Sequence, residues 1–394
     1  MYICVAKEKE TLSMNDGVLL HMEEHTRAKH QILKAYIDAW LPIMILRNAR
    51  IVYLDGFAGS GEYDDGSVGS PIISLECAAN HMLKSKFDQE AIFYFIEKDG
   101  PRHEHLVGFI ANRFKGKPNG GYENLPSKFT IVPEHGEFNT VMEGILKGLE
   151  DKNENLAPTF AFVDPFGYSD IKLNILARIL KFRKCELFIT YMVGFIDRFA
   201  TEILHQPSIK AALAVSDQEI QRISSISNSG QREIEWLNLL TSGLLAELRR
   251  VDLSIPAPYH LYFNVKNRTN NTLYYLVYYT KSIAGVKVMK EAMWKVGSEG
   301  QYLFSDYDFV PGQTSLVDYS QEKPWQREAA EYLYNYYKGK SVPVAQLENQ
   351  VILHTPWIWR KRILQVLDDE KKIEVLGYRP RAHTYPDGSS IRFL

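Results

Sequence analysis

Three glycines set among small residues follow an apolar stretch and form the clearest chemical signal in the sequence. Residues 51–55 are β-branched or apolar until the stretch ends at an acid. This order predicts a buried parallel strand that runs into a tight turn, whose backbone a ligand can approach because glycine has no side chain. We expect this turn to bind a cofactor through Asp55, Gly56, Phe57, Gly59 and Gly61. Nicotinamide, flavin and nucleotide sites use similar loops, and a tight turn without a ligand is the alternative.

A second acid-terminated strand is predicted at residues 159–164, where Asp164 is followed by Pro165, Phe166 and Tyr168. Ligands of open α/β sheets bind outside the carboxyl ends of the strands, so two such ends point to one site. An acid or an amide, then a proline and aromatic residues, is typical of methyltransferases that act on exocyclic base amines. The carboxylate and the proline carbonyl would localise the amine's lone pair by accepting its hydrogen bonds, while a ring stacks on a flipped base. A proline-terminated core strand is the alternative.

Other residues complete the predicted methyl-donor pocket. Glu97 ends an apolar strand, where an acid can accept both hydroxyls of a ribose in nicotinamide and methyl-donor sites alike. We expect Glu137 to accept a hydrogen bond from an adenine amine, and Phe138 to pack near the adenine ring. Lys29 lies on a predicted helix that often borders such a pocket, and it could pair with the donor's carboxylate. The alternatives are a solvated strand end for Glu97 and a solvated helix face for Lys29.

Alternating strands and helices must position these residues. Strands are predicted at 51–55, 91–97, 128–133, 159–164, 185–191, 259–266 and 272–280. The first five are separated by helical or loop segments, which predicts right-handed crossovers and a parallel sheet, whereas the last two are close enough to pair antiparallel. A sheet that is parallel until a final reversal is the topology of class I methyltransferases, and dinucleotide-binding dehydrogenases usually lack it.

Helical patterns before and within this alternation complete the first predicted domain. Apolar residues recur at helical spacing from Thr26 to about Leu46. Residues 197–256 show helical patterns and no obvious strand, which indicates a helical insertion over the mouth of the site. We therefore expect an α/β fold over residues 21–300, a Rossmann-like class I methyltransferase sheet with a helical insertion, preceded by an N-terminal extension at 1–20.

The last part of the chain predicts a separate winged helix-turn-helix domain at 324–394, after a linker at 301–323 that is rich in Gly, Ser, Asp and Pro. Three short helical patterns precede a predicted β-hairpin, and the segment carries eleven Lys/Arg against eight Asp/Glu, a net charge of +3. Such modules contact nucleic acid or another protein. The residues that we expect to contact DNA or RNA are Arg360, Lys361, Arg379 and Arg381.

The bulk composition is that of an ordinary globular protein. The 394 residues are 45% hydrophobic and 24% charged, with a net charge of −2, which excludes a globally basic nucleic-acid binder. The three cysteines show no metal or redox spacing, so no metal site is expected. No apolar run reaches the roughly 20 residues that a membrane span requires, and no secretory signal pattern is seen. We therefore expect a cytoplasmic protein without membrane contact.

Taken together, these motifs resemble the three-Cys-motif partner protein family (TcmP). The resemblance covers roughly residues 21–300 and rests on residues 25–30, 55–61, 69–71, 164–167, 273–276 and 280–281. It implies a Rossmann methyltransferase fold in a prokaryotic or phage protein, with a partner encoded nearby that carries the three-cysteine motif. The C-terminal part resembles the winged helix attached to such methyltransferase-like proteins. The Asp-Pro-Phe-Gly loop is also similar to that of transfer-RNA guanine dimethyltransferases.

Two functions follow as hypotheses. The first is an S-adenosylmethionine-dependent methyltransferase that acts on an exocyclic amine of a nucleic-acid base. The second is a non-catalytic interaction module with a methyltransferase fold, which docks a protein or nucleic acid through the winged helix. A nicotinamide oxidoreductase is disfavoured by the Asp164-Pro165 strand end and by the final antiparallel strands. The acceptor and the oligomeric state stay open.

Overall fold

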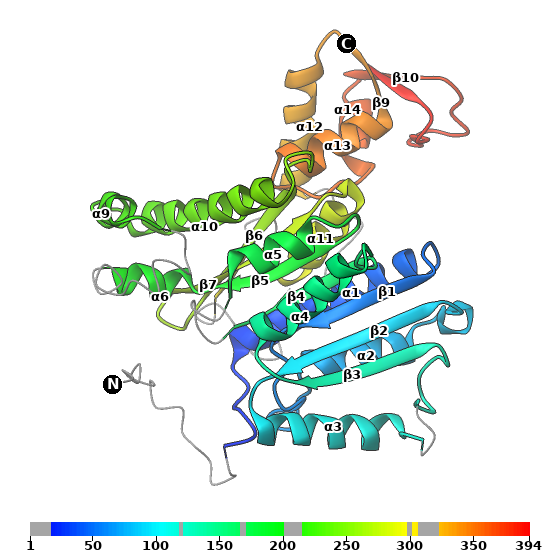
Figure 1. Ribbon diagram of the computed structural model, residues 1–394. Coiled ribbons are helices and arrows are strands. Elements are labelled where there is room, and N and C mark those ends of the chain that lie inside the picture. Colours follow the sequence, from blue (N-terminus) through cyan, green and yellow to red (C-terminus); the bar gives the residue numbers. More distant parts are fainter. Residues whose placement is uncertain (1–16, 118–120, 166–170, 201–214, 298–301, 306–322) are drawn as a thin grey trace. The chain divides into compact units, whose positions relative to one another are not determined.

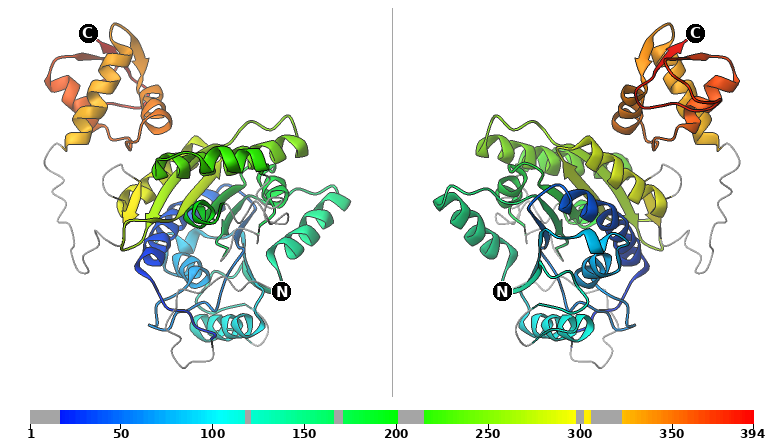
Figure 2. Two further views of the ribbon diagram at one scale, coloured as in Figure 1. Left: turned by 90° about the vertical axis from the view of Figure 1, so that its left-hand side faces the viewer. Right: turned by 90° about the vertical axis from the view of Figure 1, so that its right-hand side faces the viewer.

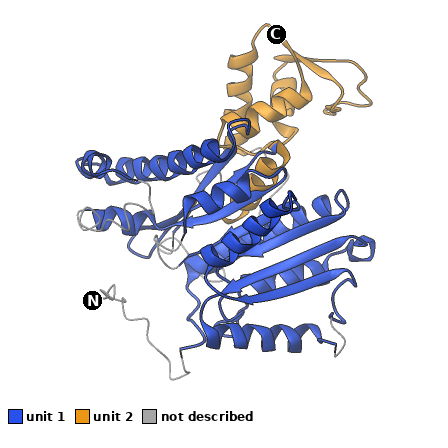
Figure 3. Cartoon of the chain, in the orientation of Figure 1, with its two compact units in different colours: residues 1–282, 304–307 blue, residues 283–303, 308–394 orange. Residues whose placement is uncertain are grey.

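The chain forms two compact units (Figure 3). Unit 1 comprises Met1–Ser282 and Phe304–Tyr307, and unit 2 comprises Ile283–Leu303 and Asp308–Leu394. The computed structural model describes residues 17–117, 121–165, 171–200, 215–297, 302–305 and 323–394.

Unit 1 is built on a large, mostly parallel sheet with the order β3-β2-β1-β4-β5-β7-β6-β8 (Figure 1). The strands are β1 Arg50–Asp55, β2 Glu90–Glu97, β3 Phe129–His135, β4 Thr159–Val163, β5 Glu186–Tyr191, β6 Tyr259–Lys266, β7 Thr272–Thr280 and β8 Leu303–Ser305. β1 to β5 pair in parallel, and β7 runs antiparallel to both β5 and β6. Seven of these strands were predicted to within two residues, and the α/β class with its final antiparallel pair is confirmed.

Helices cover both faces of this sheet, as the two side views show (Figure 2). The described helices of the first part of unit 1, with a 3₁₀ turn among them, are α1 Glu24–Ile45, α2 Ser70–Asn80, η1 Lys84–Lys86, α3 Gly100–Phe114, α4 Phe138–Asp151 and α5 Leu173–Leu180. The Tyr53 ring contacts Phe160, which in turn contacts Tyr36 of α1, whereas the adjacent Leu54 joins a core with α4 and α5. Successive strand residues point to opposite faces, so α1 and the α4–α5 pair lie on opposite sides.

Burial on both faces explains why the central strands are so apolar. Every residue of β4 and of β5 is buried. Strands that are covered by helices on both sides must carry apolar residues at successive positions rather than at alternate ones. The polar residues that remain on these strands are therefore concentrated at their ends, where a site can form.

The helical insertion predicted at 197–256 contains α9 Asp217–Ser224 and α10 Ser229–Val251, and α6 Val193–Arg198 ends at its start. α10 buries an apolar stripe that includes Trp236, Leu240 and Leu244, and it packs on α5 and α6. We expected this stretch to lie over the mouth of the site. Its described residues at 217–251 instead extend the helical layer on one face of the sheet and contribute no lining to the cavity described below.

Unit 2 combines helices with a three-stranded antiparallel sheet of order β10-β11-β9. Its elements are α11 Ile283–Val296, α12 Pro324–Tyr337, β9 Ser341–Pro343, α13 Val344–His354, α14 Arg362–Asp369, β10 Ile373–Leu376 and β11 Ser390–Phe393. We placed the first domain at 21–300, but the division into units groups α11 with the C-terminal elements.

A buried lysine connects α11 to the rest of unit 2. Lys290 is 2% exposed, and its Nζ donates hydrogen bonds to the main-chain oxygens of Val351, Ile352 and Thr355 at 3.2, 2.9 and 2.6 Å. These carbonyls lie at the carboxyl end of α13, where helical carbonyls have no partner in their own helix. Lys290 therefore caps α13 from a helix that precedes it by about fifty residues in sequence.

Candidate functional site

A cavity of about 280 Å³ lies at the carboxyl edge of the parallel strands in unit 1. Its walls come from the loop after β1, the ends of β4 and β5, the start of β7 and the beginning of α1. Six of the predicted site residues line it: Lys29, Phe57, Gly59, Gly61, Asp164 and Pro165. The fold thus brings the glycine loop and the Asp-Pro strand end to a single cavity.

The loop after β1 requires glycine at two positions. Gly59 and Gly61 have φ values of +64° and +84°, a left-handed conformation that is costly for residues with a Cβ. A Cβ at Gly61 would lie 2.7 Å from Leu106 Cδ1, so this position also lacks space. No atom lies within 4 Å of a Cβ built on Gly59, so the space beside its backbone is open. The two glycines therefore do different work: one lets the loop pack, and the other leaves room at its surface.

Glu97 holds this loop from below rather than facing the cavity. It is 5% exposed and does not line the cavity. Its Oε2 accepts a hydrogen bond from Gly59 N at 2.7 Å, and its Oε1 accepts one from Asp99 N at 2.8 Å. We predicted that Glu97 accepts ribose hydroxyls. In the structure its two oxygens accept the main-chain N–H groups of Gly59 and Asp99, so the acid at the end of β2 fixes the conformation of the glycine loop. Its role toward a ribose stays a prediction.

Asp164 is held in place by two side chains. Lys29 of α1 pairs with Oδ2, and Thr190 Oγ1 of β5 donates to Oδ1 at 2.5 Å. Thr190 is 2% exposed, so its hydroxyl is fixed by the surrounding core. We expected Lys29 to pair with the carboxylate of a methyl donor. In the structure its ammonium group pairs with Asp164, the residue that was predicted to hold the methyl acceptor. Phe166 and Tyr168, which were predicted to stack on a base, lie outside the described residues.

Aromatic rings and a neutral imidazole surround the Lys29–Asp164 pair. Lys29 Nζ lies 5.4 Å from the centre of the Tyr274 ring, and the Tyr274 hydroxyl donates to His25 O at 3.1 Å. Burial, together with the charge of Lys29, lowers the pKa of His30 to about 3, so this residue is neutral at physiological pH. At this end of the cavity, the positive charge of Lys29 offsets the negative charge of Asp164.

Ion pairs tie the loop that follows the glycines to the start of α1. His21 Nδ1 lies 3.1 Å from Asp64 Oδ2, and Arg27 pairs with Asp65. The hydrogen bond to Asp64 raises the pKa of His21. These contacts join the segment around His21 and the start of α1 to the loop that follows the glycines, and residues of both segments line the cavity. Ion pairs therefore hold this wall of the cavity together.

Asp55 and Gly56 support the site from behind its lining. Asp55 is fully buried and accepts a hydrogen bond from Phe57 N at 3.3 Å. Its burial raises the pKa of the carboxyl to about 7. Gly56 is required for packing, because a Cβ there would lie 2.7 Å from Phe138 Cδ2. Asp55 thus acts on the loop through the main chain and does not line the cavity.

The two residues predicted to contact an adenine also lie outside the cavity lining. Phe138 is 2% exposed, and its ring centre lies 5.6 Å from that of Phe57, so it packs beneath the loop. Glu137 is exposed and precedes α4, where its carboxylate accepts hydrogen bonds from Asn139 at 3.2 Å and Thr140 at 3.1 Å.

The sequence interpretation missed three residues that line the cavity near Asp164: Thr190, Met192 and Tyr274. Thr190 is a polar residue at the end of the apolar strand β5, which is the same signal that identified the ends of β1 and β4. Applying that rule to the fifth strand would have found it. Tyr274 gave no such signal, because it is one of four tyrosines among the nine residues of β7.

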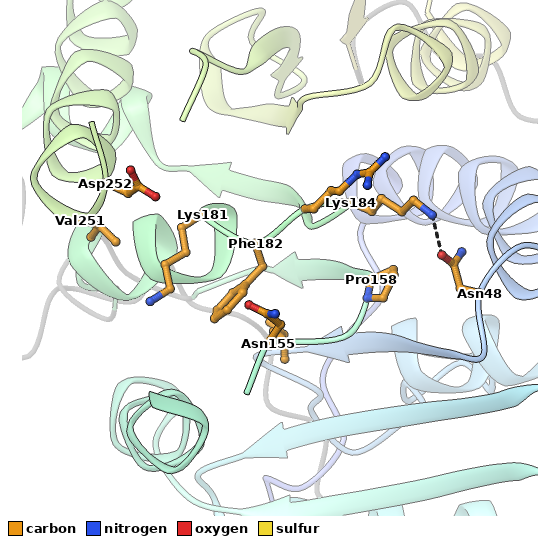
Figure 4. A pocket seen from close by; sticks show the side chains of 10 residues that line it. Asn48, Asn155, Pro158, Lys181, Phe182, Lys184, Val251 and Asp252 are labelled. Atoms are coloured by element: carbon orange, nitrogen blue, oxygen red, sulfur yellow. Dashed lines mark hydrogen bonds between the residues drawn. The ribbon is translucent and has the colours of Figure 1, made fainter. Parts of the chain in front are cut away.

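A second cavity, of about 490 Å³, lies at the opposite edge of the sheet (Figure 4). Lys181 and Lys184 line it from the turn between α5 and β5, and Pro158 lines it just before β4. Lys184 Nζ donates to Asn48 Oδ1 at 2.6 Å. This cavity lies at the amino ends of the strands, where sheets of this kind do not usually bind their ligands, and it contains none of the predicted site residues.

In unit 2, acids pair with most of the cations that were predicted to contact nucleic acid. Arg360 Nη1 lies 2.9 Å from Glu291 Oε1, Lys361 Nζ lies 2.9 Å from Asp387 Oδ1, and Arg379 pairs with Asp368. Arg360 and Lys361 precede α14 rather than lie within it. Arg381 has no ion pair among the described residues. The positive charge of this region is thus largely offset locally.

Two searches for other features were negative for the described ranges. Within them, no group of three or more His, Cys, Asp or Glu residues is arranged to hold a metal ion. No helix in the same ranges combines the length and the apolar character that crossing a membrane requires.

Comparisons with known proteins identify distant structural similarity only. No family model and no curated protein matches the chain. The chain is similar to Trm1 from Pyrococcus horikoshii, solved with S-adenosyl-L-methionine, at 14% identity and a TM-score of 0.38, over 70% of this chain and 60% of that one. It is also similar to an O-methyltransferase from Bacillus cereus solved with SAH, at 10% identity and a TM-score of 0.32, over 67% and 84% of the two chains. At these scores the function must be inferred from the strand order and the site itself.

Proposed function

We propose that the protein is an S-adenosylmethionine-dependent methyltransferase that acts on an exocyclic amine of a nucleic-acid base. The observation that carries this proposal is the meeting of the glycine loop and the Asp164–Pro165 strand end in one cavity. That cavity lies at the carboxyl edge of a sheet whose final strands reverse as in class I methyltransferases. When bound, S-adenosylmethionine supplies a methyl group on an electrophilic sulfonium, so the protein has mainly to position the acceptor and exclude water.

The residues present fit such a donor. The open space beside the left-handed Gly59 lets the main chain of the loop lie against a bound molecule. Gly61, Ser70 and Phe57 line the same wall. We propose that this wall holds the donor, while Asp55 and Glu97 keep the loop in shape through main-chain hydrogen bonds.

Asp164 and the Pro165 carbonyl would hold the acceptor. Thr190 and Lys29 each use one oxygen of the Asp164 carboxylate, and a carboxylate oxygen can accept a further hydrogen bond. An exocyclic amine bound there keeps its lone pair directed at the methyl group. Because Lys29 offsets the charge of Asp164, this end of the cavity favours a neutral amine over an ammonium ion. That preference supports a nucleobase rather than an alkylamine as the acceptor.

For unit 2 we propose a winged helix-turn-helix domain. The order of α12, β9, α13, α14, β10 and β11, with a three-stranded antiparallel sheet, supports it. We further propose that the protein works in the cytoplasm with a three-Cys-motif protein encoded nearby, on DNA or RNA. The partner assignment rests on the family resemblance of the sequence, the location on the absence of a signal pattern, and the nucleic acid on the Asp164–Pro165 strand end and the C-terminal domain.

Calorimetric titration with S-adenosylmethionine and with its demethylated product tests the donor assignment directly. We expect both to bind the full chain, and absence of binding at high micromolar concentration would exclude the proposal. Asp164→Ala removes the carboxylate that would accept the hydrogen bond of the amine, and with it the acceptor for Thr190. We expect this variant to bind the donor with little change and to lose methyl transfer to the acceptor. Donor binding without transfer to any DNA or RNA by the unmodified protein would favour the non-catalytic interaction module.

A further inference from the structure

Three partly exposed aromatic rings form a row on unit 2, and one of them, Tyr336, rests edge-on against the buried Tyr337 at 4.8 Å. Tyr332 and Tyr336 are one helical turn apart on α12, with ring centres 5.9 Å apart and planes inclined by 24°. The Trp357 ring lies 6.1 Å from Tyr332, at 61°. Tyr336 is 53% exposed, and the other two side chains are partly exposed. We call these three residues the aromatic row.

The core of unit 2 is built from other side chains of the same helix. Ala329, Ala330 and Leu333 of α12 are fully buried, and Tyr337 is 5% exposed. The apolar face of α12 is therefore complete without Tyr336. An amphipathic helix normally carries polar residues on its outer face, so an exposed ring stacked on another ring there requires a separate explanation.

Hydrogen bonds fix the orientation of the row. Gln350 of α13 donates from Nε2 to the Tyr332 hydroxyl at 2.7 Å, and its Oε1 accepts a longer bond from the Tyr337 hydroxyl at 3.4 Å. The Tyr332 ring is thus held before any ligand arrives, and Tyr336 packs against it. Rings that are already ordered lose little conformational entropy when a planar group stacks on them.

Free positive charge lies at one end of the row. Lys340 Nζ is 5.9 Å from the centre of the Tyr336 ring, and the exposed Lys338, two residues after Tyr336, has its Nζ 5.5 Å from the centre of the neighbouring Tyr334 ring. Neither lysine has an ion pair among the described residues, in contrast to Arg360, Lys361 and Arg379. At the other end of the row the charge is negative, because Glu328 lies one turn before Tyr332 on the same helix.

We propose that the aromatic row, with Lys338 and Lys340, binds single-stranded nucleic acid. Bases stack on exposed aromatic side chains whatever their sequence, and lysines beside the rings meet the phosphates. A double helix offers no unstacked bases to such a row, so single strands are preferred. This surface differs from the one predicted around Arg360, Lys361, Arg379 and Arg381, whose charges are mostly paired. It requires no methyl donor.

Fluorescence anisotropy of the full chain with short labelled oligo(U) and oligo(dT), without methyl donor, tests this surface. We expect Tyr336→Ala to weaken binding about tenfold, and Tyr336→Phe, which keeps the ring, to bind nearly as the unmodified protein does. Because Tyr336 is exposed, we expect both variants to stay folded, and thermal unfolding of each variant checks this. The double variant Lys338→Ala/Lys340→Ala should reduce the slope of log affinity against log salt by ~1.4, since each phosphate contact with a single strand contributes ~0.7.

Three results would overturn the proposal. One is the absence of binding to either oligonucleotide at low salt. Another is equal binding by Tyr336→Ala and Tyr336→Phe, combined with a loss in Arg360→Ala/Arg381→Ala, which would place the interface around α14 and the following loop. The third is a Tyr336→Ala defect confined to co-purification with a protein partner, which would make the row a protein contact. Because no donor is present, none of these outcomes depends on methyltransferase activity.

Discussion

Replacing Lys29 with methionine removes the cation that pairs with Asp164 and keeps a long unbranched side chain. The Lys29 side chain is 8% exposed and that of Asp164 22%, so most of the pair lies out of water. Removing one partner of a buried ion pair costs about 3–5 kcal/mol, because the other charge stays buried. Asp164 retains the hydrogen bond from Thr190 and some contact with solvent. We therefore expect Lys29→Met to lower the free energy of unfolding of unit 1 by about 2–3 kcal/mol.

Hydrogen exchange of the full chain measures this loss, because the slowest amides of β4 and β5 report on unit 1 separately from unit 2. The matched variants are Asp164→Asn and the double variant Lys29→Met/Asp164→Asn. The double variant should lose less than the two single losses together, by about 1 kcal/mol or more, since no unpaired charge is left. Strictly additive losses, or a Lys29→Met variant as stable as the unmodified protein, would refute the assignment of a buried, coupled pair.

Three further predictions concern other parts of the chain. Burial raises the pKa of Asp55 to about 7 from its ordinary value near 3.8, so between these pH values the folded state retains a proton that the unfolded state releases. The stability of unit 1 therefore falls as pH rises from about 4 to 7. Asp55→Asn should remove this loss: urea unfolding should find the variant more stable than the unmodified protein by about 2–4 kcal/mol at pH 8 but not at pH 4. Gly61→Ala should destabilise unit 1 by about 2 kcal/mol or more, because the new Cβ would meet Leu106. Gly59→Ala should cost only about 1–2 kcal/mol of backbone strain, but it should weaken donor binding. Equal effects of the two variants on thermal unfolding and on the calorimetric affinity for the donor would contradict the roles assigned to these glycines. Lys290→Met should lower the free energy of opening α11 and α13 by about 2–4 kcal/mol, because three hydrogen bonds are lost. Amide exchange in these helices should then be faster, while the slowest amides of unit 1 stay unchanged. Slower or unaltered exchange in α13 would rule out the capping role of Lys290.

The strands and the glycine loop could be predicted because local sequence determines them. Apolar runs of five to eight residues and the glycines at 59 and 61 reflect burial and backbone conformation, which depend on few neighbours. The rule that ligands bind at the carboxyl ends of parallel strands then joined the ends of β1 and β4 without knowledge of any contact.

The partners of the charged residues could not be predicted in the same way. Lys29 and Asp164 are separated by 135 residues, and only the packing of α1 across the sheet brings them together. Glu97 ends β2 as expected, but its hydrogen bond from Gly59 N depends on how the loop after β1 folds back, which the strand pattern does not show. In unit 2, Arg379 and Asp368 lie on different elements, and their pairing cancels charge that a count over the sequence treats as free. Tertiary contacts decide each of these cases.

The attachment of α11 to α13 determines where this protein can be divided for separate study. A fragment that begins at Pro324 would lose Lys290 and its three hydrogen bonds to the end of α13, and it would uncover apolar residues that α11 packs on α13. A fragment that begins at Ile283 would keep them covered. Expression of the C-terminal unit should therefore start directly after β7, some forty residues before the position that composition alone recommends.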